Sequence, residues 1–426
     1  MKSISLKSTV TKAVILGALI APTVLPLAAH ANEGSSVVAT ENAKQVNTFE
    51  QLKAALADAS VSAIEVTGDI TFPRAITGVP IRDVKMYSTT GAKIDLGKHY
   101  IHGKISSKEK GTFTLEGVEV VGYRKLATFF KGSNGWDFVS KDNTFDGETL
   151  VQLNNGTLTF EGTNTIDAED EIGWVAHVVF KEGSELNGIA ANSGHDRSAF
   201  KFKGTYENGW QGTVTVESTA SVILNVKNQA RSAFNGKINQ INLQSDSRLK
   251  IETEGTGLAF DKSIHHKTAP VLNVGENADL DIHSKGASKG IKPTIDLAQP
   301  GSQINVAKGA YVYITGEGTQ GIVFSAPGSS INVNEVVEFE LGNKTLGSPV
   351  FSTKKNQGNL TFAFQNQDKI EAYSDYNTLT KEWSVTEATT SIANGSTQSV
   401  DSAVADFNSE FQVQNFGRII ITQPTT

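Results

Sequence analysis

Two acidic residues in one alternating run are the strongest candidates for chemistry. Asp279 and Asp281 stand two positions apart around an apolar residue, a spacing that places both carboxylates on the outer face of a β-strand. Paired carboxylates can bind calcium, and with a cationic base beside them they can help to remove a proton from an acidic sugar. Alternating charge is also the ordinary pattern of a solvated strand. We therefore predict no catalytic residue and keep Asp279 and Asp281 as candidate metal ligands. The neighbouring partners are His283, Lys285 and Lys289.

The other polar clusters are less suited to chemistry. The acidic run at 167–171 could offer oxygens to calcium, but it lacks the spaced ligands and turn glycine of a dedicated loop, so a solvated turn is favoured. His265 and His266 are adjacent and would point to opposite faces of a strand, which makes a poor chelate. The run His195-Asp196-Arg197 forms no known catalytic motif. We expect no cofactor, with calcium as the one ion left open.

Four tryptophans could stack against a carbohydrate, because aromatic rings suit the apolar faces of pyranose sugars. Burial in the core is the more common position of a tryptophan in a β-rich chain. We keep two of the four, Trp136 and Trp174, as candidate ligand contacts. The other two are Trp210 and Trp383.

Most of the chain consists of short alternating apolar runs separated by Gly, Ser, Asp and Asn. Period-2 alternation predicts strands with one buried face, and no unit is large enough to bury its own face, so successive units must stack. An apolar-Asn-apolar triplet recurs with separations of 31, 32 and 27 residues. Such variable coils predict an all-β, right-handed parallel β-helix with Leu, Ile and Val inside and Asn, Thr, Lys and Asp outside. The triplets centre on Asn242, Asn273, Asn305 and Asn332.

The chain begins with features typical of a secretory signal peptide. Residues 1–31 contain three lysines, an apolar run at 13–20 and the sequence Ala29-His30-Ala31. Two prolines argue against an uninterrupted membrane helix. Residues 32–47 are small and polar and predict a flexible leader.

Residues 48–58 predict a short helix. Thr48 is the expected N-cap, with Gln51 as its capping-box partner. A helix before the first strand would cover the exposed end of the solenoid as an N-terminal cap.

The remaining boundaries follow from changes in the pattern. The parallel β-helix is expected over 48–342, and the aromatic-rich segment 122–146 within it is expected to form a decorated loop or insertion. Past residue 342 the strands are separated by long polar stretches. Residues 343–426 therefore predict a C-terminal β cap, packed on the last rung or standing as a small β region.

Composition narrows the classes of partner. The chain has no cysteine and a net charge of −7. No basic patch or basic amphipathic helix is present, so we expect no nucleic acid partner. After residue 31 no apolar stretch is long enough to span a bilayer and no LPxTG sequence is found, so we expect no membrane insertion after signal removal. These features fit export from a Gram-positive bacterium.

Several stretches resemble a known family. They are Thr48-Phe49 with Leu52 and Ala55-Leu56, the runs 64–70 and 91–96, and the closing runs 407–411 and 415–419. Together they resemble the pectate-lyase-like adhesive domain of Gram-positive bacterial surface proteins, over roughly residues 48–422. The resemblance implies the β-helix fold of pectate lyases with an adhesive role in place of a catalytic one.

The sequence thus predicts a secreted or cell-surface, non-catalytic adhesin or binding module. Its partner would be a host or bacterial surface glycan or protein, held by the outer faces of stacked rungs. We expect a monomer in the extracellular space, associated non-covalently with the cell wall. The alternative is an extracellular polysaccharide lyase or glycoside hydrolase, because one scaffold hosts both functions. The lyase needs acidic and basic outward residues that converge in a groove near Asp279 and Asp281.

Overall fold

The computed structural model describes residues 42–423 with internal gaps. The predicted signal peptide and most of the predicted leader therefore lie outside the described residues. The gaps are 192–197, 204–211, 228–231, 235–237, 261–267, 286–292, 318–320, 346–347, 349, 354–359, 366–368, 374–375, 378–379, 381, 384–389, 394–397 and 402–416.

The N-terminal helix forms where the sequence predicts it. Helix α1 (Phe49–Ala57) begins after Thr48, whose side-chain oxygen accepts a hydrogen bond from the Gln51 amide at 3.3 Å. In return the Gln51 side chain accepts from the Asn47 amide at 3.0 Å. The helix packs against β1 and β4. Its buried side chains are Phe49, Leu52, Ala55 and Leu56.

The end of the predicted leader is a strand. Strand β1 (Lys44–Val46) pairs in parallel with β2 (Ala63–Val66). Val46 is buried whereas Lys44 and Gln45 are exposed. The small polar composition of 32–47 hides this strand, because a single apolar side chain anchors it.

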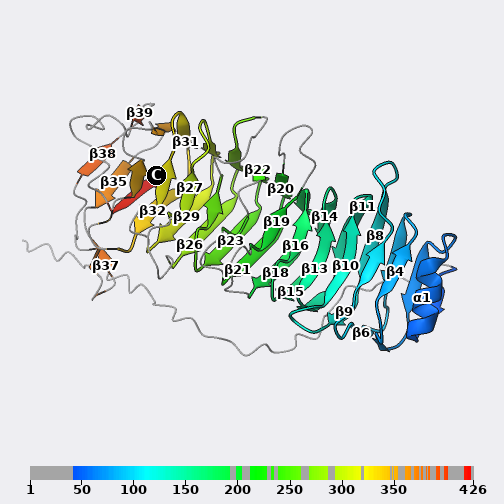
Figure 1. Ribbon diagram of the computed structural model, residues 1–426. Helices are drawn as coiled ribbons and strands as arrows, with labels where there is room; N and C mark the ends of the chain where they lie inside the picture. Colours follow the sequence, from blue (N-terminus) through cyan, green and yellow to red (C-terminus); the bar gives the residue numbers. More distant parts are fainter. Residues whose placement is uncertain are drawn as a thin grey trace, which may run out of the picture. The chain divides into compact units, whose positions relative to one another are not determined.

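The rungs form two long sheets, sheet A and sheet B, each of 14 strands (Figure 1). In spatial order, sheet A contains β1, β2, β5 (Val84–Tyr87), β8 (Gly111–Glu116), β11 (Trp136–Lys141), β14 (Thr157–Glu161), β17 (His177–Phe180), β20 (Gly212–Val216), β22 (Ile238–Leu243), β25 (Val271–Val274), β28 (Gln303–Val306), β31 (Ser329–Asn334), β34 (Leu360–Gln365) and β39 (Gln398–Asp401). Sheet B contains β3 (Ile70–Thr71), β6 (Lys93–Asp95), β9 (Glu119–Val121), β12 (Thr144–Gly147), β15 (Thr163–Ala168), β18 (Glu185–Ala190), β21 (Ser221–Val226), β23 (Arg248–Thr253), β26 (Asp279–Ser284), β29 (Tyr311–Gly316), β32 (Glu338–Asn343), β40 (Arg418–Thr422), β35 (Lys369–Tyr373) and β38 (Thr390–Ala393).

A third face consists of two shorter sheets, sheet C and sheet D. Single bridges from Phe200 to Phe234 and from Phe234 to Leu258 connect them. Sheet C contains β4 (Ile76–Val79), β7 (Ile101–Gly103), β10 (Thr128–Ser133), β13 (Thr149–Leu153), β16 (Gly173–Val175) and β19 (Phe200–Phe202). Sheet D contains β24 (Leu258–Ala259), β27 (Ile295–Leu297), β30 (Val323–Ser325) and β33 (Phe351–Thr353). Outside these four sheets, β36 (Tyr376–Asn377) pairs with β37 (Glu382–Trp383).

Equivalent residues stack in register from rung to rung. In sheet B, for example, Leu249, Leu280 and Val312 are successive parallel partners. All three are buried, and the residues on either side of each are more exposed. This confirms the parallel β-helix and its apolar interior. The handedness of the coil stays a prediction, supported by the general right-handedness of parallel crossovers.

The aromatic-rich segment 122–146 is not an insertion. It supplies β10, β11 and most of β12, and five of its aromatic side chains are buried in the core. Phe113 and Phe138 stack with their ring planes 1° apart, and Phe130 meets Trp136 edge to face. Of the aromatics in this segment, Tyr123 alone is exposed, at 57%. The expectation of a decorated loop was wrong because these rings form the interior of regular rungs. The buried five are Phe129, Phe130, Trp136, Phe138 and Phe145.

The C-terminal part closes the coil with antiparallel strands. Parallel pairing continues past residue 342 into β33 and β34, so the solenoid extends beyond the predicted boundary. Strand β40 then pairs antiparallel with β32, and β39 does so with β34. The cap is therefore packed on the last rungs. In the part of the chain that the structure describes, no helix is long and apolar enough to cross a bilayer.

Candidate functional site

Trp174 lies on the outer face of sheet C and is half-buried. Its indole Nε1 donates to Glu171 Oε2 at 3.0 Å, which fixes the orientation of the ring. The Lys201 and Lys203 ammonium groups lie 4.6 Å and 5.4 Å from a Trp174 ring centroid. Cations at these distances are attracted to the face of an indole. A partly open aromatic ring thus has two ammonium groups beside it, both from the β19 side.

Trp174 belongs to a polar row that runs across sheet C. Its register partners are Gln152 on one side and Lys201 on the other. The row continues from Gln152 to Lys131 and His102. These five residues, together with Lys203, are called the Trp174 face below. Adjacent strands lie about 4.8 Å apart, so the row presents closely spaced groups along the sheet.

The charge of the Trp174 face is predominantly positive. Lys201 lies 3.8 Å from the fully buried carboxylate of Glu171. The Lys131 ammonium group lies 4.1 Å from the centroid of the Tyr100 ring. Among the described residues, neither Lys131 nor Lys203 has a carboxylate partner. Burial lowers the pKa of His102, and the nearby Lys131 lowers it further. This imidazole is therefore neutral at pH 7, and the positive charge comes from the lysines.

The structure does not support Trp136 as a ligand contact. Its side chain is fully buried, and its Nε1 donates to the backbone oxygen of Lys104 at 2.9 Å. Both faces of the ring are enclosed by the core, so no ligand could stack on it. Trp136 shares the inner face of β11 with Phe138, which is also fully buried. The sequence does contain a pattern that predicts this orientation, because Phe138 stands two positions after Trp136 and an apolar residue at that spacing indicates the buried face.

The two candidate metal ligands, Asp279 and Asp281, both point outward, as their spacing predicts. Each has a cation on the preceding rung: Arg248 Nε lies 3.1 Å from Asp279, and Lys250 Nζ lies 3.6 Å from Asp281. Partial burial raises the pKa of Asp279, and Arg248 offsets this only in part. The neighbour His283 hydrogen-bonds Thr315 at 2.9 Å. The acidic and basic groups converge on this face as an array of ion pairs.

The acidic run 167–171 is organised by one arginine. Arg124 binds Asp146 and Asp167 at 2.7 Å each and Glu169 at 3.1 Å. The hydrogen bonds that Arg124 donates, first of all the one to Asp167, raise the pKa of Arg124. The run is not the solvated turn that we expected, because two of its carboxylates bind a cation and Glu171 is buried. Among the described residues, no group of three or more His, Asp or Glu side chains is arranged to hold a metal.

Four of the other sequence candidates cannot be placed. Trp210, the run at 195–197 and the pair His265 and His266 lie outside the described residues. Trp383 belongs to β37, and its side chain lies outside the described part.

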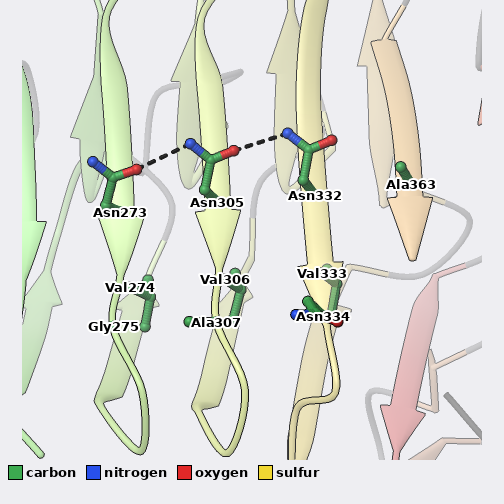
Figure 2. Close-up of a pocket in the computed structure, with 10 residues that line it drawn as sticks. All are labelled: Asn273, Val274, Gly275, Asn305, Val306, Ala307, Asn332, Val333, Asn334 and Ala363. Atoms are coloured by element: carbon green, nitrogen blue, oxygen red, sulfur yellow. Dashed lines mark hydrogen bonds between the residues drawn. The ribbon is translucent and has the colours of Figure 1, made fainter. Parts of the chain in front are cut away.

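A groove on sheet A was not predicted from the sequence (Figure 2). It has a volume of about 450 Å³ and crosses β25, β28, β31 and β34. Three half-buried asparagines on neighbouring rungs line it, and their side-chain amides are hydrogen-bonded in a ladder. The recurring triplets correctly predicted that these asparagines face outward. The hollow beside them arises from residues further along the strands. The asparagines are Asn273, Asn305 and Asn332.

The comparisons with known proteins agree with the predicted resemblance. Residues 43–170 match a family model described as a "Putative pectate lyase-like adhesive domain". The family resemblance is thereby confirmed for this part of the chain. Because the matched domain is adhesive, the match supports a non-catalytic binding module over an enzyme. No curated protein sequence matches the chain.

Among solved structures, the chain is similar to L. reuteri 53608 SRRP. The TM-score is 0.39 with 15% sequence identity, covering 75% of this chain and 98% of that chain. A likeness this distant transfers neither residues nor ligands.

Proposed function

We propose that this protein is an exported, non-catalytic adhesin that binds a carbohydrate carrying carboxylate or sulfate groups. The Trp174 face is the binding surface. The observation that carries the proposal is the half-buried Trp174 ring on an outward sheet, with the ammonium groups of Lys201 and Lys203 beside it. An indole suits the apolar face of a pyranose ring, and ammonium groups beside it suit the anionic substituents.

The carboxylates elsewhere on the solenoid favour binding over catalysis. A general base or a metal ligand needs an accessible carboxylate. Asp279 and Asp281 instead have cationic partners on the preceding rung, and Arg124 binds three acidic side chains. We expect any calcium effect on ligand binding to be small for the same reason.

The test is a glycan-array screen of the mature protein, with and without calcium. Wild type is compared with Trp174→Ala and with Tyr311→Ala, an exposed aromatic on sheet B that serves as the matched control. We expect binding to anionic glycans that Trp174→Ala abolishes and Tyr311→Ala preserves. Equal binding by wild type and Trp174→Ala would contradict the proposed surface.

The same samples are assayed for unsaturated products on polygalacturonate by ultraviolet absorbance. No product is expected from wild type. Turnover that disappears in Asp279→Ala or Asp281→Ala would establish the lyase alternative.

We further propose that residues 1–31 direct export and are removed. The basic start, the apolar run and the Ala-His-Ala sequence support this. N-terminal sequencing of protein secreted by a Gram-positive host should begin at Asn32. Recovery of the intact chain only from the cell membrane would contradict export with cleavage.

A further inference from the structure

The sheet A groove owes its depth to small residues beside the asparagine ladder. The position after next from each ladder asparagine also lines the groove. It is Gly275 just after β25, Ala307 just after β28 and Asn334 at the end of β31, so two of the three are small. At Gly275 a Cβ atom would lie 2.7 Å from the Leu243 backbone oxygen, so the close approach of two rungs excludes any larger residue there. The outer face of the sheet is consequently hollow next to the amides (Figure 2).

The ladder holds its amides in fixed orientations. Asn273 Nδ2 donates to Asn242 Oδ1 at 2.9 Å, and Asn305 Nδ2 donates to Asn273 Oδ1 at 3.0 Å. Asn332 Nδ2 donates to Asn305 Oδ1 at 2.8 Å. Because the side chains are already ordered, a ligand that binds them pays little conformational entropy.

The ladder leaves hydrogen-bonding capacity facing the groove. An asparagine amide offers two N–H donors and two acceptor lone pairs. Asn273 and Asn305 each use one donor and one lone pair within the ladder. The next register partner beyond Asn332 is Ala363, whose methyl group cannot donate, and Asn332 Oδ1 has no partner among the described residues. Asn332 uses both of its donors, because its Nδ2 also donates to Ser330 Oγ at 3.2 Å. The groove therefore offers one donor and one acceptor at Asn273 and at Asn305, and a carbonyl at Asn332.

The groove has no charge with which to bind an ion. None of its ten lining residues is acidic or basic. An anionic ligand would lose hydration here without gaining a cationic partner, and this is unfavourable. The occupant must therefore be uncharged and rich in groups that both donate and accept, and the hydroxyls of a sugar have this property.

The spacing of the row distinguishes a glycan from a peptide. Successive amides lie one strand apart, about 4.8 Å. An extended peptide laid along the row repeats its same-side groups every ~6.6 Å and loses register within a few rungs. An extended chain of pyranose rings repeats at close to the rung spacing, so each ring can meet one amide.

We propose that the sheet A groove is a second ligand site, which binds a neutral, linear oligosaccharide along the ladder with one sugar ring on each rung. This goes beyond the acidic carbohydrate assigned to the Trp174 face. The small residues at Gly275 and Ala307 make room for the rings, and the free amide groups bind their hydroxyls.

Calorimetric titration of the mature protein with neutral hexasaccharides tests this site. The neutral probes are β-1,4-linked mannohexaose, cellohexaose, xylohexaose and N-acetylchitohexaose. The β-1,4-linked mannuronate hexamer is the charged counterpart of mannohexaose. Asn305→Ala removes the central amide. Ala307→Leu fills the groove and leaves the ladder intact, and Asn225→Ala is the control because Asn225 is an outward asparagine on sheet B.

We expect at least one neutral hexamer to bind wild type and the Asn225→Ala control equally. Asn305→Ala and Ala307→Leu should each weaken that binding by about tenfold or more. Thermal unfolding checks that Ala307→Leu remains folded. Trp174→Ala should leave the binding unchanged, so failure at this site is distinguishable from failure at the Trp174 face.

Three results would overturn the proposal. The first is no binding by any neutral hexamer. The second is binding that Ala307→Leu, in folded form, does not weaken. The third is tighter groove binding by the mannuronate hexamer or by an uncharged Ser/Thr decapeptide, which would assign the groove to an anion or to a peptide.

Discussion

At the scale of single residues, two tryptophans that the sequence offers as ligand contacts lie on opposite sides of the solenoid wall. Trp136 points into the core, and Trp174 points out, with Lys201 and Lys203 beside its ring. The alternation around Trp136 contains enough information to place it, because Phe138 marks the same face. The neighbours of Trp174 come from other rungs and are 22 and 27 positions away, at Gln152 and Lys201. Local sequence cannot supply that register.

Substitution of the two tryptophans should therefore separate stability from binding. We expect Trp136→Ala to lower the free energy of unfolding by about 3–5 kcal/mol, because it empties a fully enclosed core position. Trp174→Ala should lower it by only about 1–2 kcal/mol, since the ring is partly exposed but the buried Glu171 carboxylate loses one donor. Denaturant unfolding of both variants measures this difference. Comparable losses in both would contradict the placement of the two rings.

His283 should make stability depend on pH. Burial is the main cause that lowers its pKa, and Lys344 adds to it, whereas Glu317, Glu252 and Asp281 act in the opposite direction. The unfolded chain therefore takes up a proton near pH 6.5, before the folded chain does. The free energy of unfolding that this difference contributes above pH 6.5 should be lost as the pH falls toward the pKa of His283 in the folded chain.

The change His283→Gln removes this titration and should flatten the fall in unfolding temperature between pH 7 and pH 5. The measurement is thermal unfolding of variant and wild type across that range. Parallel curves would show that His283 does not contribute to the pH dependence.

At the scale of elements, one arginine closes the end of the capping helix. Arg82 Nη2 donates to the backbone oxygens of Ala55 and Leu56 at 3.3 Å each, and its Nε donates to Val61 O at 2.8 Å. The last carbonyls of a helix have no partners within the helix. Arg82 thus joins the end of α1 to the first rungs, and no local pattern predicts this role because its partners lie 21 to 27 positions away.

We expect Arg82→Ala to lower the free energy of unfolding by about 2 kcal/mol, because carbonyl groups at the helix end lose a charged donor. The matched control is Arg74→Ala. Arg74 forms an exposed ion pair with Glu50, and such pairs contribute at most about 1 kcal/mol. Urea unfolding gives both values. An equal, small effect of the two changes would contradict a capping role for Arg82.

The elements differ in how far the sequence predicts them. Regular strands and the α1 cap follow from short-range alternation and from Thr48 and Gln51, and they form where expected. The antiparallel closure depends on partners far apart in the chain: Arg418 Nη2 binds Glu340 at 2.8 Å across 78 residues. No local pattern specifies such a pairing. This explains why the sequence left the arrangement of the C-terminal cap open.

At the scale of the whole solenoid, the outer faces carry different chemistries. Sheet B presents paired charges at Asp279 and Asp281. Sheet C presents the basic Trp174 face, and sheet A presents a neutral groove. A parallel β-helix permits this division because each face repeats at every rung while its core stays apolar. Composition averages over these faces, so the net charge of −7 does not reveal the basic surface.

The most direct test of the proposed function is calorimetric titration of the mature protein with a galacturonate hexamer, followed by absorbance of the same samples for unsaturated products. We predict measurable binding without product, and an affinity about tenfold or more weaker in Trp174→Ala. Product formation by wild type, or unchanged affinity in Trp174→Ala, would contradict a non-catalytic adhesin that binds acidic carbohydrate through this face.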